Sequence, residues 1–65
     1  MIVLYTIGCP KCNILEEKLD AKNIQYKKCE DKDIMISKNM DKLPVLEIDG
    51  MCMDYISAND WINEQ

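Results

Sequence analysis

Residues 2–12 read IVLYTIGCPKC, and this stretch holds two of the four cysteines in the chain. It begins with an apolar run, residues 2–5, whose β-branched and aromatic members stop shortly before Gly8. A short apolar run bounded by glycine is typical of a buried strand. Pro10 suits the first turn of a helix, because the N–H that proline lacks would have no partner there. The stretch therefore predicts a strand that passes through a turn into a helix.

The predicted helix covers about residues 10–22 and ends near Asn23. Its apolar face consists of Cys12, Leu15 and Leu19, which recur at the spacing of a helix, while acidic and lysine side chains fill the other faces. This pattern is that of an amphipathic helix with one face against a core.

Two elements are expected before residue 40. Residues 24–29 begin with alternating apolar and polar side chains, which suggests a second strand. In residues 30–40, Asp31 is placed to cap a short helix that carries Ile34 and Met35.

A hairpin and a final helix are expected after Pro44. Residues 45–48 and 51–53 are apolar runs separated by Asp-Gly, a strong hairpin signal. Ser57 lies three residues before Asp60 and resembles the start of a capping box for the last helix.

The expected order is strand–helix–strand–(helix)–strand–strand–helix, in a single domain over residues 1–65. The helix between the first two strands predicts that they are parallel, whereas the hairpin strands are antiparallel. The fold class is thus α/β, with a mixed four-stranded sheet flanked by about three helices.

Composition narrows the environment and the partners of the chain. The formal net charge is −4, so the surface repels phosphate and nucleic acid is not an expected partner. No apolar run approaches the roughly 20 residues of a membrane span, so no membrane partner is expected. Residues 1–5 are too short for a signal peptide. We expect a cytoplasmic monomer whose thiols stay reduced, which counts against a framework of structural disulfides.

The chain has no histidine, so a Cys-His nucleophile pair is excluded and any metal site would use thiolates. The string C-P-x-C also occurs in zinc knuckles, but the second C-x2-C pair is missing, because Cys29 and Cys52 are far apart in the sequence. A thiolate site for zinc, or an iron–sulfur cluster bridged between two chains by Cys9, stays an alternative. The interpretation that we favour, redox chemistry at the two cysteines, involves no metal.

The predicted helix start favours redox chemistry at Cys9 and Cys12. Cys9 falls at the N-cap, where unpaired N–H groups and the helix dipole stabilise a thiolate, and Lys11 adds a cation. Cys12 is three residues further on, so the two sulfurs can meet. We therefore expect Cys9 to attack a target disulfide and Cys12 to resolve the mixed disulfide, with Pro10 and Lys11 as supporting residues.

Two longer strings carry a family resemblance over nearly the whole chain. YTIGCPKC (residues 5–12) after the first strand and LPVLEIDG (residues 43–50) before the hairpin resemble the glutaredoxin-like branch of the thioredoxin fold. The resemblance implies a minimal glutaredoxin-like fold and a dithiol disulfide reductase. In that family the matching proline follows a cis peptide bond beside the cysteines, and the preceding residue binds substrate through its backbone. These roles would fall to Pro44 and Leu43.

The resemblance implies no bound cofactor, because the redox group would be a Cys9–Cys12 disulfide. Its substrates would be disulfide-containing proteins or small molecules. The electron donor stays open between glutathione and a thioredoxin-reductase-type enzyme. The loop from Thr6 to Cys9 lacks the lysine that commonly grips glutathione, and MDYIS replaces a Gly-Gly-x-Asp stretch.

Several other residues have two interpretations each. Tyr55 is a candidate to flank the substrate groove and Asp54 to bind a substrate amine, the alternatives being rim packing and a turn. Cys29 and Cys52 are expected to be small buried hydrophobes. The later methionines are expected to fill the core: Met35, Met40, Met51 and Met53. A second rival function is a non-catalytic adaptor that uses a thioredoxin-like groove only to bind proteins.

Overall fold

The computed structural model describes residues 1–65 and contains seven elements. They are β1 (Ile2–Tyr5), α1 (Pro10–Ala21), β2 (Lys27–Cys29), α2 (Lys32–Ser37), β3 (Val45–Ile48), β4 (Met51–Met53) and α3 (Tyr55–Asn63). This order confirms the one expected, including the short helix before the hairpin. No helix combines the length and the apolar character needed to cross a membrane.

The four strands form one mixed sheet in the order β2-β1-β3-β4. β1 is parallel to β2 and antiparallel to β3, and β3 and β4 form the antiparallel hairpin. Asp49 and Gly50 both have positive φ, as a two-residue turn of this type requires. The expected α/β fold with a mixed four-stranded sheet is therefore confirmed, and its two edge strands are β2 and β4.

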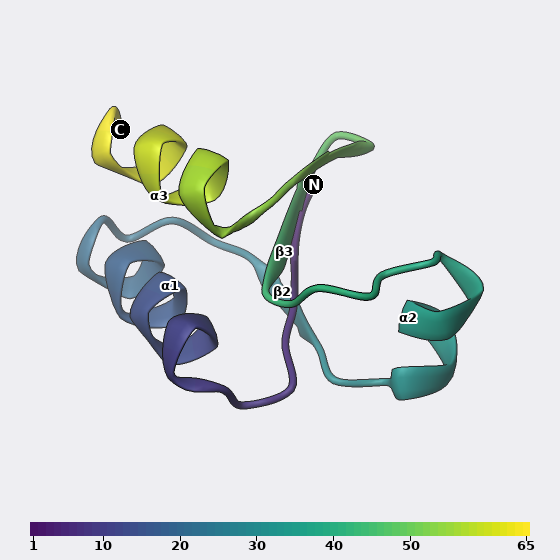
Figure 1. Ribbon diagram of the computed structural model, residues 1–65. Helices are drawn as coiled ribbons and strands as arrows, with labels where there is room; N and C mark the ends of the chain where they lie inside the picture. The colour runs from purple at the N-terminus through teal and green to yellow at the C-terminus, as the bar shows by residue number, and fades with distance from the viewer.

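The main core lies on one face of the sheet, where Figure 1 shows α1 and α3 side by side. Leu4 and Leu46 are paired across β1 and β3 and point to this face. The core cluster consists of Leu4, Leu15, Leu19, Leu46, Ala58 and Ile62. Each buried leucine contributes about 1.5–3 kcal/mol through removal of its side chain from water. The α1 face predicted from sequence is thus the one that packs on the sheet.

The opposite face is covered only in part, by the short helix α2 (Figure 1). Tyr5 and Met35 are buried there. The Lys38 ammonium lies 5.3 Å from the centroid of the Tyr5 ring and 3.2 Å from a carboxylate oxygen of Glu47. The sheet therefore has one complete helical layer and one small patch.

Two asparagines end the helices α1 and α2. Asn23 and Asn39 both have φ of 57°, a left-handed conformation that asparagine tolerates better than most residues. The N–H that follows each one returns to a carbonyl near the helix end: Ile24 N to Leu19 O, and Met40 N to Met35 O. The predicted end of the first helix near Asn23 is confirmed.

The second strand is shorter than the predicted range 24–29. Only Lys27–Cys29 pairs with β1. Ile24 and Tyr26 instead pack, half-buried, against the core. The strand is short because the turn at Asn23 leads the chain over the core first, and the chain joins the sheet only at Lys27.

The burial of Cys52 and Met51 was predicted wrongly. Cys52 is exposed and Met51 is 64% exposed, because β4 is an edge strand of the sheet. Cys29 is half-buried rather than buried. Met35 is a core residue as expected, while Met40 and Met53 are half-buried.

Candidate active site

Cys9 is the N-cap of α1, as the sequence predicted. Its backbone is extended, with φ −74° and ψ 164°, and Pro10 occupies the first turn. The backbone N–H of Cys12 donates to the Cys9 Sγ at 3.3 Å. A thiolate at Cys9 therefore receives a hydrogen bond from the helix start and lies at the positive end of the helix dipole.

The two thiols differ in exposure. Cys9 is half-buried, whereas Cys12 is 0% exposed, and neither forms a disulfide in this structure. Burial of Cys12 disfavours its thiolate. The side chains of Cys9 and Thr6 and nearby backbone N–H groups act in the opposite direction and hold the pKa of the Cys12 thiol below its ordinary value. An incoming molecule can thus reach Cys9 but not Cys12.

Thr6 is part of this site and was missed in the sequence. It is fully buried, and its N–H donates to the Cys29 carbonyl of β2 at 3.0 Å. Its hydroxyl oxygen accepts the N–H of Gly8 at 3.1 Å, which holds the loop that leads to Cys9. Gly8 has φ of 76°, a conformation that favours glycine. The signal was available: a β-branched hydroxyl residue between a buried strand and a glycine.

A pocket of about 520 Å³ brings together most of the other predicted site residues. Its lining includes Lys11, Leu43, Pro44, Asp54 and Tyr55, which come from α1, the loop before β3 and the start of α3. The structure therefore gathers residues that are more than thirty positions apart in the chain. Cys9 and Cys12 do not line the pocket, but Lys11 lies between them in the sequence.

The Leu43–Pro44 peptide bond is cis, as the family resemblance implied, and Pro44 is buried. The lining also includes Asp41, Lys42 and Ile56, which the sequence analysis did not select. Lys42 directly precedes Leu43, so its approach to the pocket follows from the position of that loop.

Lys11 packs on an aromatic ring of the same pocket. Its ammonium lies 5.4 Å from the centroid of the Tyr55 ring, within the range of a cation–π contact. The lining contains two cations, Lys11 and Lys42, and two carboxylates, Asp41 and Asp54. This charge pattern suits a small molecule or peptide that carries both signs.

Asp54, and not Ser57, caps α3. The Asp54 carboxylate accepts the N–H of Ser57 at 2.8 Å, so the helix begins at Tyr55. Ser57 is the donor to this cap, and the predicted N-cap was three residues late. The Ser57 N–H lowers the pKa of Asp54, which keeps the carboxylate charged at the pocket edge.

The four cysteines are spread over the fold. Cys29 lies on β2 and Cys52 on β4, at opposite edges of the sheet. No group of three or more His, Cys, Asp or Glu side chains is arranged to hold a metal ion.

Comparison with known proteins adds no relative to this picture: no protein-family model matches the chain, and no curated protein is found to be similar.

Proposed function

We propose that this protein is a thiol–disulfide oxidoreductase with a minimal glutaredoxin-like version of the thioredoxin fold. One observation carries the proposal: the accessible Cys9 sulfur accepts a helix N–H from Cys12, while the Cys12 thiol is buried behind it. A reactive thiol needs access and stabilisation of its thiolate, and Cys9 has both.

The reaction would proceed in two exchanges. The Cys9 thiolate attacks one sulfur of a target disulfide, a bond forms between them, and the other target sulfur leaves as a thiolate. The Cys12 thiolate then attacks the Cys9 sulfur and releases the second target thiol. The target gains two electrons and two protons, and the protein keeps a Cys9–Cys12 disulfide that an external thiol reductant must reduce.

The local environment supports this order of steps. The lowered pKa of Cys12 raises the fraction of the thiolate that the second step uses. The Cys12 N–H stabilises a thiolate at Cys9, which makes Cys9 a good leaving group in that step. Thr6 holds the loop between β1 and Cys9 and so positions the attacking sulfur.

The pocket beside Lys11 suggests where a small thiol would bind. Lys11 and Lys42 offer cations for carboxylates, and Asp54 offers a charged acceptor for an amine. These features favour a peptide thiol such as glutathione as the donor, although the loop before Cys9 has no lysine. A thioredoxin-reductase-type enzyme is the alternative donor, and cytoplasm is the setting in which either would act.

A coupled NADPH assay tests the proposal. The reduced protein is offered a disulfide substrate, with glutathione and its reductase in one tube and thioredoxin reductase in the other. We expect turnover in at least one tube. If glutathione is the donor, Lys42→Glu should raise its KM with little change in kcat, because the substitution reverses a charge that lines the pocket.

Matched cysteine variants separate catalysis from binding. Cys9→Ser should abolish turnover, and Cys12→Ser should accumulate a mixed disulfide at Cys9 that mass spectrometry detects. Cys52→Ser is the control, because Cys52 is exposed on β4 outside the site. If the Cys9→Ser protein still binds its protein partners as tightly as the native protein does, and the native protein shows no turnover, the non-catalytic adaptor would be favoured. Zinc or iron in the purified protein, with no turnover in either tube, would overturn the redox proposal in favour of a thiolate metal site.

A further inference from the structure

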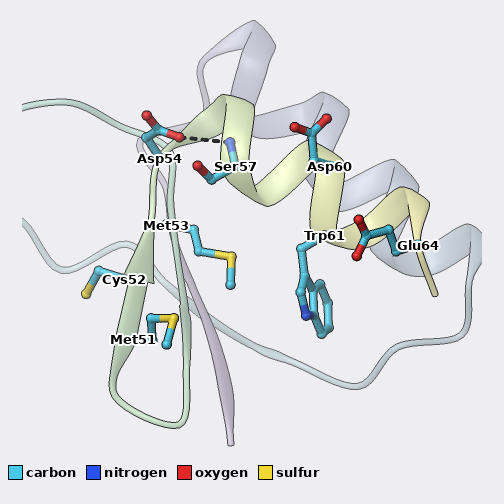
Figure 2. Close-up of a pocket in the computed structure, with 8 residues that line it drawn as sticks. All are labelled: Met51, Cys52, Met53, Asp54, Ser57, Asp60, Trp61 and Glu64. Atoms are coloured by element: carbon cyan, nitrogen blue, oxygen red, sulfur yellow. Dashed lines mark hydrogen bonds between the residues drawn. The ribbon is translucent and has the colours of Figure 1, made fainter.

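A groove whose lining does not include Cys9 or Cys12 lies between the edge strand β4 and α3. It has a volume of about 690 Å³. In Figure 2 the side chains of Met53, from β4, and Trp61, from α3, extend into the same space. Cys52 points to the other side of the strand. The groove thus has an apolar wall on each side, and one of them is a large aromatic ring.

The polar rim of this groove is acidic. Asp54, Asp60 and Glu64 line it, and no lysine or arginine does. None of the three carboxylates takes part in a salt bridge; the ion pairs of the chain involve other acidic residues. The Asp54 carboxylate is held by the Ser57 N–H at the start of α3, whereas Asp60 and Glu64 have no ion-pair partner. Negative charge beside an aromatic face attracts cations and disfavours acidic partners.

The groove is bordered by a sheet edge whose backbone is free to pair. β4 has β3 as its only neighbour. In a hairpin with a two-residue turn, the residues next to the turn exchange hydrogen bonds and the next pair does not. Ile48 and Met51 are the pair next to the turn, so the N–H and C=O of Cys52 point away from β3. These two groups can bind one residue of an added strand.

We propose that β4 and α3 form a docking surface for an extended, lysine- or arginine-containing segment of a partner protein. The segment adds to the edge of β4 through Cys52, and its basic side chains enter the acidic groove. This proposal is independent of the redox function, since no step of it involves Cys9 or Cys12. The groove adjoins the pocket that Lys11 and Pro44 line, because Asp54 lines both.

The alternation of side chains specifies the sequence of such a segment. A residue directly opposite Cys52 points its side chain to the face that Cys52 occupies. The residues before and after it point to the face of Met51 and Met53, where Trp61 and the carboxylates lie. Basic residues are therefore expected two positions apart, with a central residue that binds through its backbone.

The test uses labelled peptides of about six residues, a common strand length, in which lysine alternates with valine. Binding is measured by fluorescence anisotropy, and its location by the amide and indole NMR signals of the protein. We expect saturable binding that shifts the Cys52 amide and the Trp61 indole signals. A peptide of the same composition with its lysines grouped, and one N-methylated at the central residue, should each bind more weakly.

A double variant and a matched control test the role of charge. Asp60→Lys with Glu64→Lys should weaken binding by about tenfold, because it replaces attraction by repulsion at the rim. Glu17→Lys with Asp33→Lys makes the same change in net charge elsewhere, on exposed positions of α1 and α2, and should leave affinity unchanged. Thermal unfolding of both variants checks that each is folded.

Four results would overturn the proposal. The alternating peptide fails to bind, or a glutamate–valine peptide binds equally well. The control variant weakens binding as much as the groove variant does. The fourth is that, without any peptide, the amide signals of Cys52 and of Lys27–Cys29 change together when the protein is diluted. That result would mean that a second copy of the protein occupies the edge of β4 through its own β2.

Discussion

The backbone N–H of Cys12 donates a hydrogen bond to the Cys9 sulfur, which stabilises a thiolate there, while the thiol of Cys12 is buried. The helix start produces both effects. Position Cys9 has an extended backbone and an accessible side chain, and position Cys12 is one turn inside, on the face that packs on the core. The C-x2-C spacing therefore assigns different environments to two identical groups.

The first prediction concerns the order in which the thiols react. In the reduced, folded protein, iodoacetamide should modify Cys9 and Cys52 well before Cys12, because Cys12 is fully buried. A time course followed by peptide mass spectrometry measures the three rates. In denaturant the differences should disappear. Equal rates at Cys9 and Cys12 in the folded protein would contradict the proposed division of roles.

The second prediction concerns the Thr6 hydroxyl. Thr6→Val keeps the shape of the side chain but removes the acceptor of the Gly8 N–H, which should cost about 0.5–1.5 kcal/mol of unfolding free energy, because Gly8 is exposed and its N–H can bind water instead. It should also raise the pKa of Cys12, because Thr6 helps to lower it. Urea unfolding and the NMR titration of the Cys12 Cβ signal measure the two effects.

Thr6→Ser is the matched control, since it retains the hydroxyl and should keep both properties close to those of the native protein. If Val and Ser variants behave alike, the hydroxyl has no role in the loop.

The third prediction is a pH dependence of stability in the reduced protein. The pKa of Cys12 is lower in the folded state than its ordinary value of 9.0. A lowered pKa means that the folded state releases the proton first, so the unfolded state binds more protons between the two values. Stability from Cys12 should therefore increase as pH rises from the folded pKa towards 9.0, and be lost as pH falls through the folded pKa. Urea unfolding across this range, with Cys12→Ala as reference, isolates the contribution; an identical pH profile in the variant would refute it.

The fourth prediction concerns the cap of α3. Asp54→Ala should lower the midpoint of urea unfolding, because the Ser57 N–H loses its acceptor, whereas Asp54→Ser should restore most of the loss. The pKa of Asp54 is lowered in the folded state, so its contribution is present above its ordinary value of 3.8 and is lost as pH falls through the folded pKa. An Asp54→Ser protein should show less destabilisation by acid than the native protein. Equal acid sensitivity would mean that Asp54 does not titrate with folding.

Much of the fold could be predicted because local signals and periodicity agreed. Cys9 and Pro10 marked a helix start, Asp31 capped the short helix, and Asp49 and Gly50 formed the hairpin turn. In each case the residue type satisfies a backbone requirement at its own position, so no distant contact was needed to identify it.

The errors arose where distant contacts decide. Alternation correctly placed Cys52 opposite to Met51, but it could not show that both side chains would stay exposed on an edge strand. Asp54 and Ser57 are both good capping residues. Asp54 is the N-cap because α3 begins immediately after β4. The pocket beside Lys11 depends on three segments that meet only in the folded protein.

The difference in burial between Cys9 and Cys12 has a consequence for sequence of events that does not depend on how reactive either thiol is. Any disulfide exchange at this site has only one sterically open order: a bond to an outside partner forms first at Cys9, and the bond that displaces the partner comes from the interior. Even two thiols of equal nucleophilicity would follow that order. Which cysteine bonds the partner would then be a property of packing, imposed by the same helix face that holds the core together.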